Sequence, residues 1–183
     1  MNIHELVDRA MRSMVQNGQV RPTVYAEFSE STVKEFPLFN FIGDGRTKAH
    51  QLFVLGREVG HKPEYADKAL QEICFVSEVW LTSGQSNPNP GMKPPGNVPS
   101  RECAMFLIVE AVAPFSQHAT LYTVMRTGKG RPGQLVLFQD DVPVDGMMAQ
   151  AFIAGWRSRD LSDAVVRAMQ PRGMRAFLQQ GRQ

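Results

Sequence analysis

The sequence predicts an α+β domain, built on one mostly antiparallel β-sheet of about six strands with helices packed on one face. Six segments show period-two alternation, or are short runs of branched and aromatic residues, and both patterns are typical of strands. Most are joined by short links, which favour antiparallel pairing. The strand–helix–strand alternation of a doubly wound fold is missing. At 183 residues the chain is expected to form one domain over 1–183.

The chain is predicted to begin with an amphipathic helix over residues 3–16. Its apolar residues recur at three- and four-residue intervals and form one stripe. Asn2 is a suitable capping residue, and Asn17-Gly18 ends the helix because glycine adopts the left-handed conformation at little cost. Two strands follow, over 20–28 and 33–42, and Pro37 places the second at an edge or at a break.

The middle of the chain is predicted to contain one long helix, one short helical piece and a third strand. A helix opens at Asp44-Gly45 and runs to about Val59, and a short helical piece spans about 64–70. The third strand covers 72–82. Residues 83–100 contain five prolines, three glycines and three asparagines, a composition that predicts a long irregular loop.

Three more strands and a helical tail complete the prediction. The strands cover 103–113, 118–127 and 134–140. The tail, 145–183, is predicted to be helical over 147–156 and 161–170, with a further short piece after Pro171. It is also the one basic segment, with six arginines and no lysine against three aspartates. The net charge of the whole chain is only +2, which gives no global electrostatic case for binding nucleic acid.

Residues 128–133, Gly-Lys-Gly-Arg-Pro-Gly, have the glycine spacing of a dinucleotide-binding turn. That turn needs a helix directly after it, because the helix N-terminus supplies the N–H groups that bind pyrophosphate. Here the next segment, Gln-Leu-Val-Leu-Phe, is a predicted strand, and Pro132 removes one N–H donor. The segment is therefore interpreted as a hairpin loop, and no cofactor is predicted.

The sequence gives no pattern for a metal site or an activated nucleophile. The four histidines have neither the i, i+4 helical spacing nor the i, i+2 strand spacing that converges on one ion. Cys74 and Cys103 lie in apolar strands, where burial raises the pKa of a thiol and keeps it inert. No serine stands in a Gly-x-Ser-x-Gly turn. No metal is predicted, and the enzyme question stays open with a preference for a non-catalytic protein.

Charged residues within apolar strands are the candidates for a functional site. Glu78 and Trp80 are expected on one face of their strand, and Glu102 and Glu110 on one face of the next. An antiparallel sheet can bring Glu78, Glu110 and Arg126 together. The favoured interpretation is a cross-strand salt bridge on an exposed sheet face. The alternative is a polar pocket in which Glu78 acts as acid or base and Trp80 forms a wall.

Four short motifs between residues 56 and 137 resemble a group of uncharacterised bacterial and phage proteins. The motifs are Gly56-Arg57, Glu78-Val79-Trp80, Pro99-Ser100 and Arg101-Glu102. Val79 replaces the usual alanine, and the spacing between Ser100 and Arg101 is shorter than in the group. No activity is assigned to these proteins, so the resemblance implies no reaction. It adds Ser100 and Arg101 as candidate ligand-binding residues beside Trp80, and Glu102 beside Glu78 and Arg126 as a candidate catalytic residue.

These observations favour a small cytoplasmic accessory protein that acts through a protein partner or by self-association. The first alternative is a small-molecule-binding protein or enzyme that uses a pocket at Glu78, Trp80 and Arg126. The second is weak binding of nucleic acid through the arginines of the C-terminal helices. No continuous apolar stretch has the length of a membrane span, and the N-terminus lacks the apolar core of a signal peptide, so no membrane association is expected.

Overall fold

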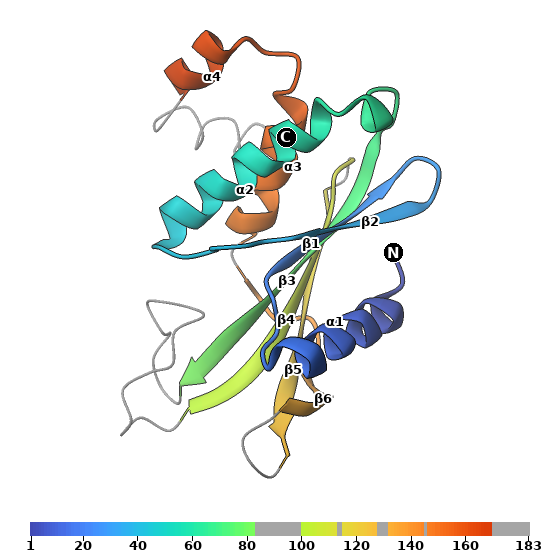
Figure 1. The fold of residues 1–183 in the computed structure, drawn as a ribbon, viewed down its shortest axis with the longest axis vertical. Helices are drawn as coiled ribbons and strands as arrows, with labels where there is room; N and C mark the ends of the chain where they lie inside the picture. The colour runs from blue at the N-terminus through green and yellow to red at the C-terminus, as the bar shows by residue number, and fades with distance from the viewer. Residues whose placement is uncertain (83–99, 113–114, 128–131, 145, 170–183) are drawn as a thin grey trace.

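The computed structural model describes residues 1–183 except 83–99, 113–114, 128–131, 145 and 170–183 (Figure 1). The elements alternate as the sequence predicts, with two strands after the first helix and four after the second. In chain order they are α1 (Ile3–Asn17), β1 (Thr23–Phe28), β2 (Thr32–Pro37), α2 (Gly45–Gly60), a 3-10 turn (Pro63–Tyr65), β3 (Leu70–Thr82), β4 (Ser100–Glu110), β5 (Gln117–Arg126), β6 (Pro132–Gln139), α3 (Met147–Arg157) and α4 (Asp163–Met169).

The six strands form one sheet in the order β2-β1-β3-β4-β5-β6, and each neighbouring pair is antiparallel. This confirms the predicted α+β class and the antiparallel sheet of six strands. The β5–β6 pairing, with Arg126 opposite Pro132, also confirms that the glycine-rich segment joins two strands of a hairpin. Residues 128–131 at its tip lie outside the described part.

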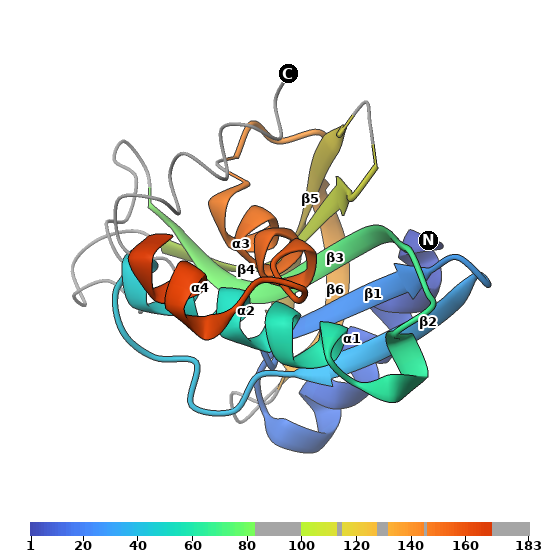
Figure 2. The ribbon, with the colours of Figure 1, turned by 90° about the horizontal axis from the view of Figure 1, so that it is seen from above.

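The helices cover both faces of the sheet, which corrects the prediction that they pack on one face. Helix α1 lies against one face, and α2 and α3 lie against the other (Figures 1 and 2). Neighbouring strand residues divide between the two cores: Val24 and its partner Phe75 face α2 and α3, whereas Tyr25 and its partner Cys74 face α1. Both faces of β1 are therefore covered, so the face with Thr23, Tyr25 and Glu27, which looks polar in the sequence, is largely buried.

Helix α1 is capped at both ends as the sequence indicates. The Asn2 side chain accepts a hydrogen bond from the His4 N–H at 3.0 Å. Gly18 has φ of 78° and donates its N–H to the Met14 carbonyl oxygen at 2.8 Å. The stripe formed by Leu6, Ala10 and Met14 packs on the sheet. The caps fix where α1 ends, and so they fix where the chain turns back into β1.

Strand β2 is shorter than predicted because the chain leaves the sheet at Pro37. Proline has no N–H to continue the strand ladder. The Leu38 N–H instead donates to the Pro22 carbonyl oxygen at 2.8 Å, and Asn40 adopts a positive φ of 57°. Residues 38–42 therefore form an irregular segment ahead of α2, which begins after the capping residue Asp44.

Helices α2 and α3 touch through their backbones. A Cβ atom at Gly56 would collide with the carbonyl oxygen of Phe152, and one at Gly155 would collide with the carbonyl oxygen of Phe53. Because glycine has no side chain, the main chain of each helix can approach the other closely at these two positions. The contact presses α3 onto α2 and places the Phe152 ring in the core between the helices and the sheet.

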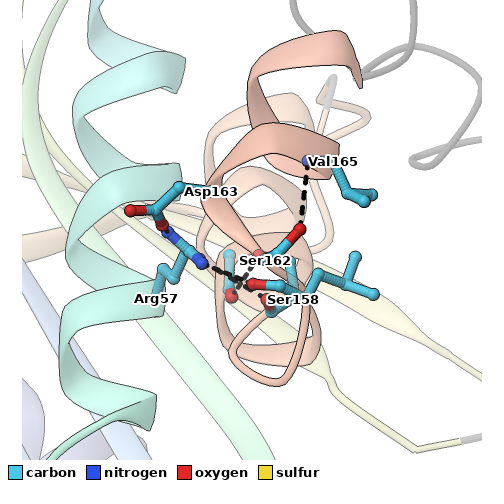
Figure 3. Close-up of polar contacts among 7 residues, drawn as sticks. Arg57, Ser158, Ser162, Asp163 and Val165 are labelled. Carbon is cyan, nitrogen blue, oxygen red and sulfur yellow. Dashed lines mark hydrogen bonds and ion pairs between the residues drawn. The ribbon is translucent and has the colours of Figure 1, made fainter.

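Arg57, the residue after Gly56, ties α2 to the segment that joins α3 and α4 (Figure 3). Its Nη1 lies 2.6 Å from Asp163 Oδ1, and its Nη2 donates to the Leu161 carbonyl oxygen at 2.6 Å. Ser162 Oγ accepts a hydrogen bond from the Val165 N–H at 3.4 Å, next to the start of α4. The predicted helices of the tail are thus present as α3 and α4, whereas the predicted third piece falls in 170–183, outside the described residues.

Within the described ranges, no helix is both long enough and apolar enough to cross a membrane.

Replacing Gly56 by alanine is expected to lower the free energy of unfolding by about 3 kcal/mol, because the new methyl group meets main-chain atoms that cannot rotate away. Urea denaturation measures the change. Gly45→Ala in the same helix is the matched control, since its Cβ would make only ordinary contacts with Met147 and Met148. Equal stability of the two variants would contradict the close backbone contact.

Candidate ligand-binding site

Four of the six predicted site residues gather on the α1 face of the sheet. Glu78 and Trp80 lie on β3, Glu102 on β4 and Arg126 on β5. Trp80 and Glu102 are direct partners across the β3–β4 pair. They lie at the end of the sheet where α1 ends, since Arg126 Nη1 is 3.5 Å from the Gly18 carbonyl oxygen.

Glu102 and Arg126 form a two-pronged ion pair. The Arg126 Nε donates to Glu102 Oε2 at 2.6 Å, and its Nη2 makes a second hydrogen bond to Glu102 Oε1. Glu102 is only 8% exposed. A carboxylate that is so deeply buried needs a cation close by, and the guanidinium fork matches both of its oxygens. This pair is therefore a cross-strand salt bridge, with Glu102 in the place that the sequence analysis gave to Glu110.

Glu110 lies at the other end of the sheet. The prediction that it meets Glu78 and Arg126 is therefore wrong. Its strand partner is Glu72, and its Oε2 accepts a hydrogen bond from the Ser116 N–H at 3.3 Å. Because β3 and β4 are antiparallel, Glu78 and Glu110 sit on opposite ends of their pair. Both β4 glutamates share a face, and only the strand register decides which of them meets Arg126.

Glu78 is a carboxyl group in a half-buried position beside a second acid. Its Oε1 accepts a hydrogen bond from the Trp80 Nε1–H at 3.1 Å. Burial, and then the nearby charge of Glu102, raise the pKa of Glu78 above its ordinary value. The Trp80 hydrogen bond, the Arg126 charge and the Val20 N–H act against this rise without cancelling it. Glu78 thus holds a proton more readily than an ordinary exposed glutamate does.

The other two predicted residues do not join the cluster. Arg101 lies on the opposite face of the sheet, where its guanidinium carbon stands 4.3 Å from the centre of the Phe138 ring. Ser100 is the exposed first residue of β4, opposite Thr82. The idea that Pro99-Ser100 anchors a loop over the cluster concerns residues 83–99, which lie outside the described part.

A pocket of about 440 Å³ opens beside the start of β1, where β3 continues past Thr23 and its edge is free. Three segments enclose it: residues 19–22 before β1, residues 38–42 after β2, and residues 75–79 of β3. Met105 of β4 and Met148 of α3 contribute to the wall. Glu78 is the only one of the six predicted site residues that lines this pocket. Its other lining residues were not predicted from the sequence.

The pocket is mainly apolar with a few polar groups. Its apolar lining is aromatic and aliphatic, from Leu38, Phe39, Phe41, Ile42, Phe75, Val79, Met105 and Met148. Ser77 lies among them and is 9% exposed, and its hydroxyl makes no hydrogen bond with another described residue. A hydroxyl can both donate and accept a hydrogen bond, so Ser77 can interact with a polar atom inside the pocket.

Two cations stand near the aromatic residues of the pocket. The guanidinium carbon of Arg21 is 5.0 Å from the centre of the Phe39 ring, and the Lys48 Nζ is 5.6 Å from the centre of the Phe41 ring. Arg21 also donates to Asn17 Oδ1 at 3.0 Å. With Glu78 on the β3 wall, the pocket has charged groups of both signs around an apolar interior.

Sequence reasoning missed residues 38–42 because they were assigned to a strand that continues through Pro37. The available signal was an apolar run, Leu-Phe-Asn-Phe-Ile, that follows a proline and ends at Gly43. Such a run cannot continue as a central strand after the proline. Its side chains then have to cover another part of the protein, and here they form a wall of the pocket.

A second polar cluster, also missed, joins β5 to the end of β6. His118 Nε2 is 2.9 Å from Asp140 Oδ1 and 3.2 Å from Thr120 Oγ, and its Nδ1 is 3.3 Å from Asp141 Oδ1. The residue types are those of a nucleophile, a base and an acid. However, the Thr120 hydroxyl donates to Asp140 at 2.6 Å, which lowers the pKa of Asp140, and Thr120 is buried. The threonine proton is therefore held by a carboxylate, and the cluster fastens the chain after β6.

Metal-ligating side chains do not converge in the described ranges, where no group of three or more from His, Cys, Asp and Glu is found. Both cysteines are buried, and burial raises the pKa of the Cys74 and Cys103 thiols. No family model, no curated protein and no solved structure matches this chain. The resemblance of its four short motifs to bacterial and phage proteins therefore stays a prediction.

Glu78→Gln is expected to gain stability relative to the wild type as the pH rises. The raised pKa means that the folded protein holds the Glu78 proton more tightly than the unfolded chain does. Raising the pH from 4.5, the ordinary pKa of glutamate, to the folded value therefore removes stability from the wild type only. Thermal unfolding from pH 4 to 8 measures this, with Glu58→Gln, at an exposed position of α2, as the surface control. A Glu78→Gln curve parallel to the wild type would contradict it.

Arg126→Met is expected to lower the free energy of unfolding by about 2 to 3 kcal/mol, because it leaves the buried Glu102 without its ion-pair partner. The double variant Arg126→Met/Glu102→Gln is expected to recover a large part of this loss, since the buried charge is then gone. Chemical denaturation at pH 7 compares the two. No recovery in the double variant would count against the pairing.

Proposed function

We propose that this chain is a small-molecule-binding protein, and that its site is the pocket between residues 19–22, 38–42 and the free edge of β3. The observation that supports it is a mainly apolar pocket of about 440 Å³ whose wall also carries two polar side chains of β3, Ser77 and Glu78. Ligand sites in proteins have volumes of roughly 300 to 1,000 Å³, with apolar walls and a small number of polar groups that orient the ligand.

The lining indicates the chemical class of ligand. Aromatic and methionine side chains favour a flat or compact apolar group, such as a ring system, over an extended polar chain. The Ser77 hydroxyl can hydrogen-bond one polar atom of that group. Burying about 100 Å² of apolar surface contributes roughly 2.5 kcal/mol, so the apolar contacts provide much of the affinity.

The charged groups indicate how the ligand is oriented. Arg21 and Lys48 attract a negative substituent toward the side of the pocket formed by Phe39 and Phe41. Glu78, with its raised pKa, can donate a hydrogen bond when protonated and accept one when charged. Glu78 is also our candidate for an acid or base should the bound molecule react. Glu102 and Arg126 are engaged with each other, and we assign them a supporting role.

The nucleic-acid alternative gains no support from the arginines of the tail that the structure describes. Arg157 donates to the Ala111 carbonyl oxygen at 2.7 Å, and the Arg159 guanidinium stacks over Trp156 at 4.5 Å. Both guanidinium groups thus contact other residues of the fold, and together they do not form a basic surface.

The test uses 8-anilinonaphthalene-1-sulfonate, an aromatic anion that fluoresces when it enters an apolar site. We expect saturable binding to the wild type. Ile42→Asn is expected to weaken the affinity about three- to tenfold, because it removes an apolar wall residue. Val15→Asn is the matched control, since it changes an equally accessible apolar residue on α1 and should leave the affinity unchanged.

Two results would count against this site. One is the lack of any saturable fluorescence with the wild-type protein. The other is a loss of affinity in Val15→Asn that equals the loss in Ile42→Asn.

Ser77→Val tests the polar contact. It keeps the wall apolar and removes the hydroxyl, so a polar ligand found later should bind this variant more weakly than the wild type.

A further inference from the structure

Strand β6 ends the sheet and exposes apolar residues on both of its faces. Leu137 is 57% exposed on the α1 face, and Val136 and Phe138 are exposed on the other. Among the described residues, the β6 backbone has strand pairing with β5 alone. Its last six residues, Gln-Leu-Val-Leu-Phe-Gln, contain no charge and no proline. An apolar, neutral edge of this kind is a template for pairing with another strand.

The opposite edge of the same sheet is protected. Strand β2 carries the exposed Lys34 and Glu35 and ends at Pro37. Charges on an edge strand oppose further strand pairing, whereas β6 carries no charge and has its one proline, Pro132, at its first position. The two edges are thus different in the property that matters for association, and only β6 is suited to extend the sheet.

We propose that β6 pairs with β6 of a second copy of this chain, antiparallel and around a two-fold axis, so that the sheets of two molecules become continuous. The pairing needs only one segment, because each copy supplies the surface that the other requires. It keeps the antiparallel pattern of the whole sheet. It also removes apolar side chains of β6 from water on both faces, together with unpaired N–H and C=O groups along the edge.

Charge favours this antiparallel arrangement over a parallel one. Asp140 and Asp141 directly follow β6 and are exposed. With Leu137 at the two-fold axis, the Asp140 residues of the two copies lie six residues apart along the paired strands, roughly 20 Å, which is beyond the screening length at physiological salt. They also lie near the end of the partner strand where Arg126 is paired with Pro132. A parallel pair would bring the four acids together.

Sedimentation equilibrium over a wide concentration range tests the proposal. The wild type is expected to show twice the chain mass, and Leu137→Lys is expected to raise the dimer dissociation constant at least tenfold. Ile42→Lys is the matched control, because it places the same charge on an exposed apolar residue at the ligand pocket. A wild type that stays monomeric, or a Leu137→Lys dimer as tight as the wild type, would overturn the proposal.

A cross-linking measurement keeps the test independent of overall stability. Leu137→Cys is expected to form a disulfide-linked dimer under mild oxidation, since symmetry places the two side chains near the axis. Val15→Cys on α1 is expected to stay monomeric, and the native cysteines do not interfere because both are buried. Equal cross-linking of the two variants would contradict a β6 interface. Binding of the fluorescent anion is independent of this result, so the dimer and the pocket can fail separately.

Discussion

The backbone contact between α2 and α3 is the constraint on which the rest of the α2–α3 side depends. It requires glycine on both helices, Gly56 and Gly155, because each main chain occupies the place of a side chain on the other. The contact sets the height of α3 above the sheet, and so it sets the positions of Phe152 in the core and Met148 at the pocket. Arg57 then fastens the start of α4 to the same helix pair.

The two covered faces explain why the polar residues lie where they do. Helix α1 and the α2–α3 pair bury the middle of the sheet, and charged strand residues there would lose their hydration. Glu78, Glu102 and Arg126 stand instead at the end of the α1 face, beside Gly18. Glu78 belongs both to this cluster and to the pocket on the strand edge, so a ligand that changes its charge also affects the ion pair beside it.

The number and order of helices and strands could be predicted because these features depend on local sequence. The alternation in β1 and the stripe in α1 are visible in their own residues. The assignment of helices to faces was wrong because it depends on which apolar residues share a core: Tyr25 looks like a polar-face residue until α1 is known to cover it. The predicted end of β2, at residue 42, was also wrong, although Pro37 marks the residue where the strand stops.

The site was less predictable than the fold because it depends on register and on irregular backbone. Glu78, Trp80 and Arg126 were identified as charged or aromatic residues of apolar strands. The choice between Glu102 and Glu110 needed the β3–β4 register, which the alternation of residues within each strand does not give. The wall formed by residues 38–42 depends on the positive φ of Asn40 and on the Leu38–Pro22 hydrogen bond, neither of which follows from a periodic pattern.

Under the function proposed for this chain, the pocket beside the free edge of β3 binds a small apolar molecule. The most direct measurement is the change in backbone amide NMR shifts when the anilinonaphthalene anion is added to the ¹⁵N-labelled protein. We expect the largest changes in residues 19–22, 38–42 and 77–79. Changes concentrated in β6, or spread evenly over the surface, would contradict it.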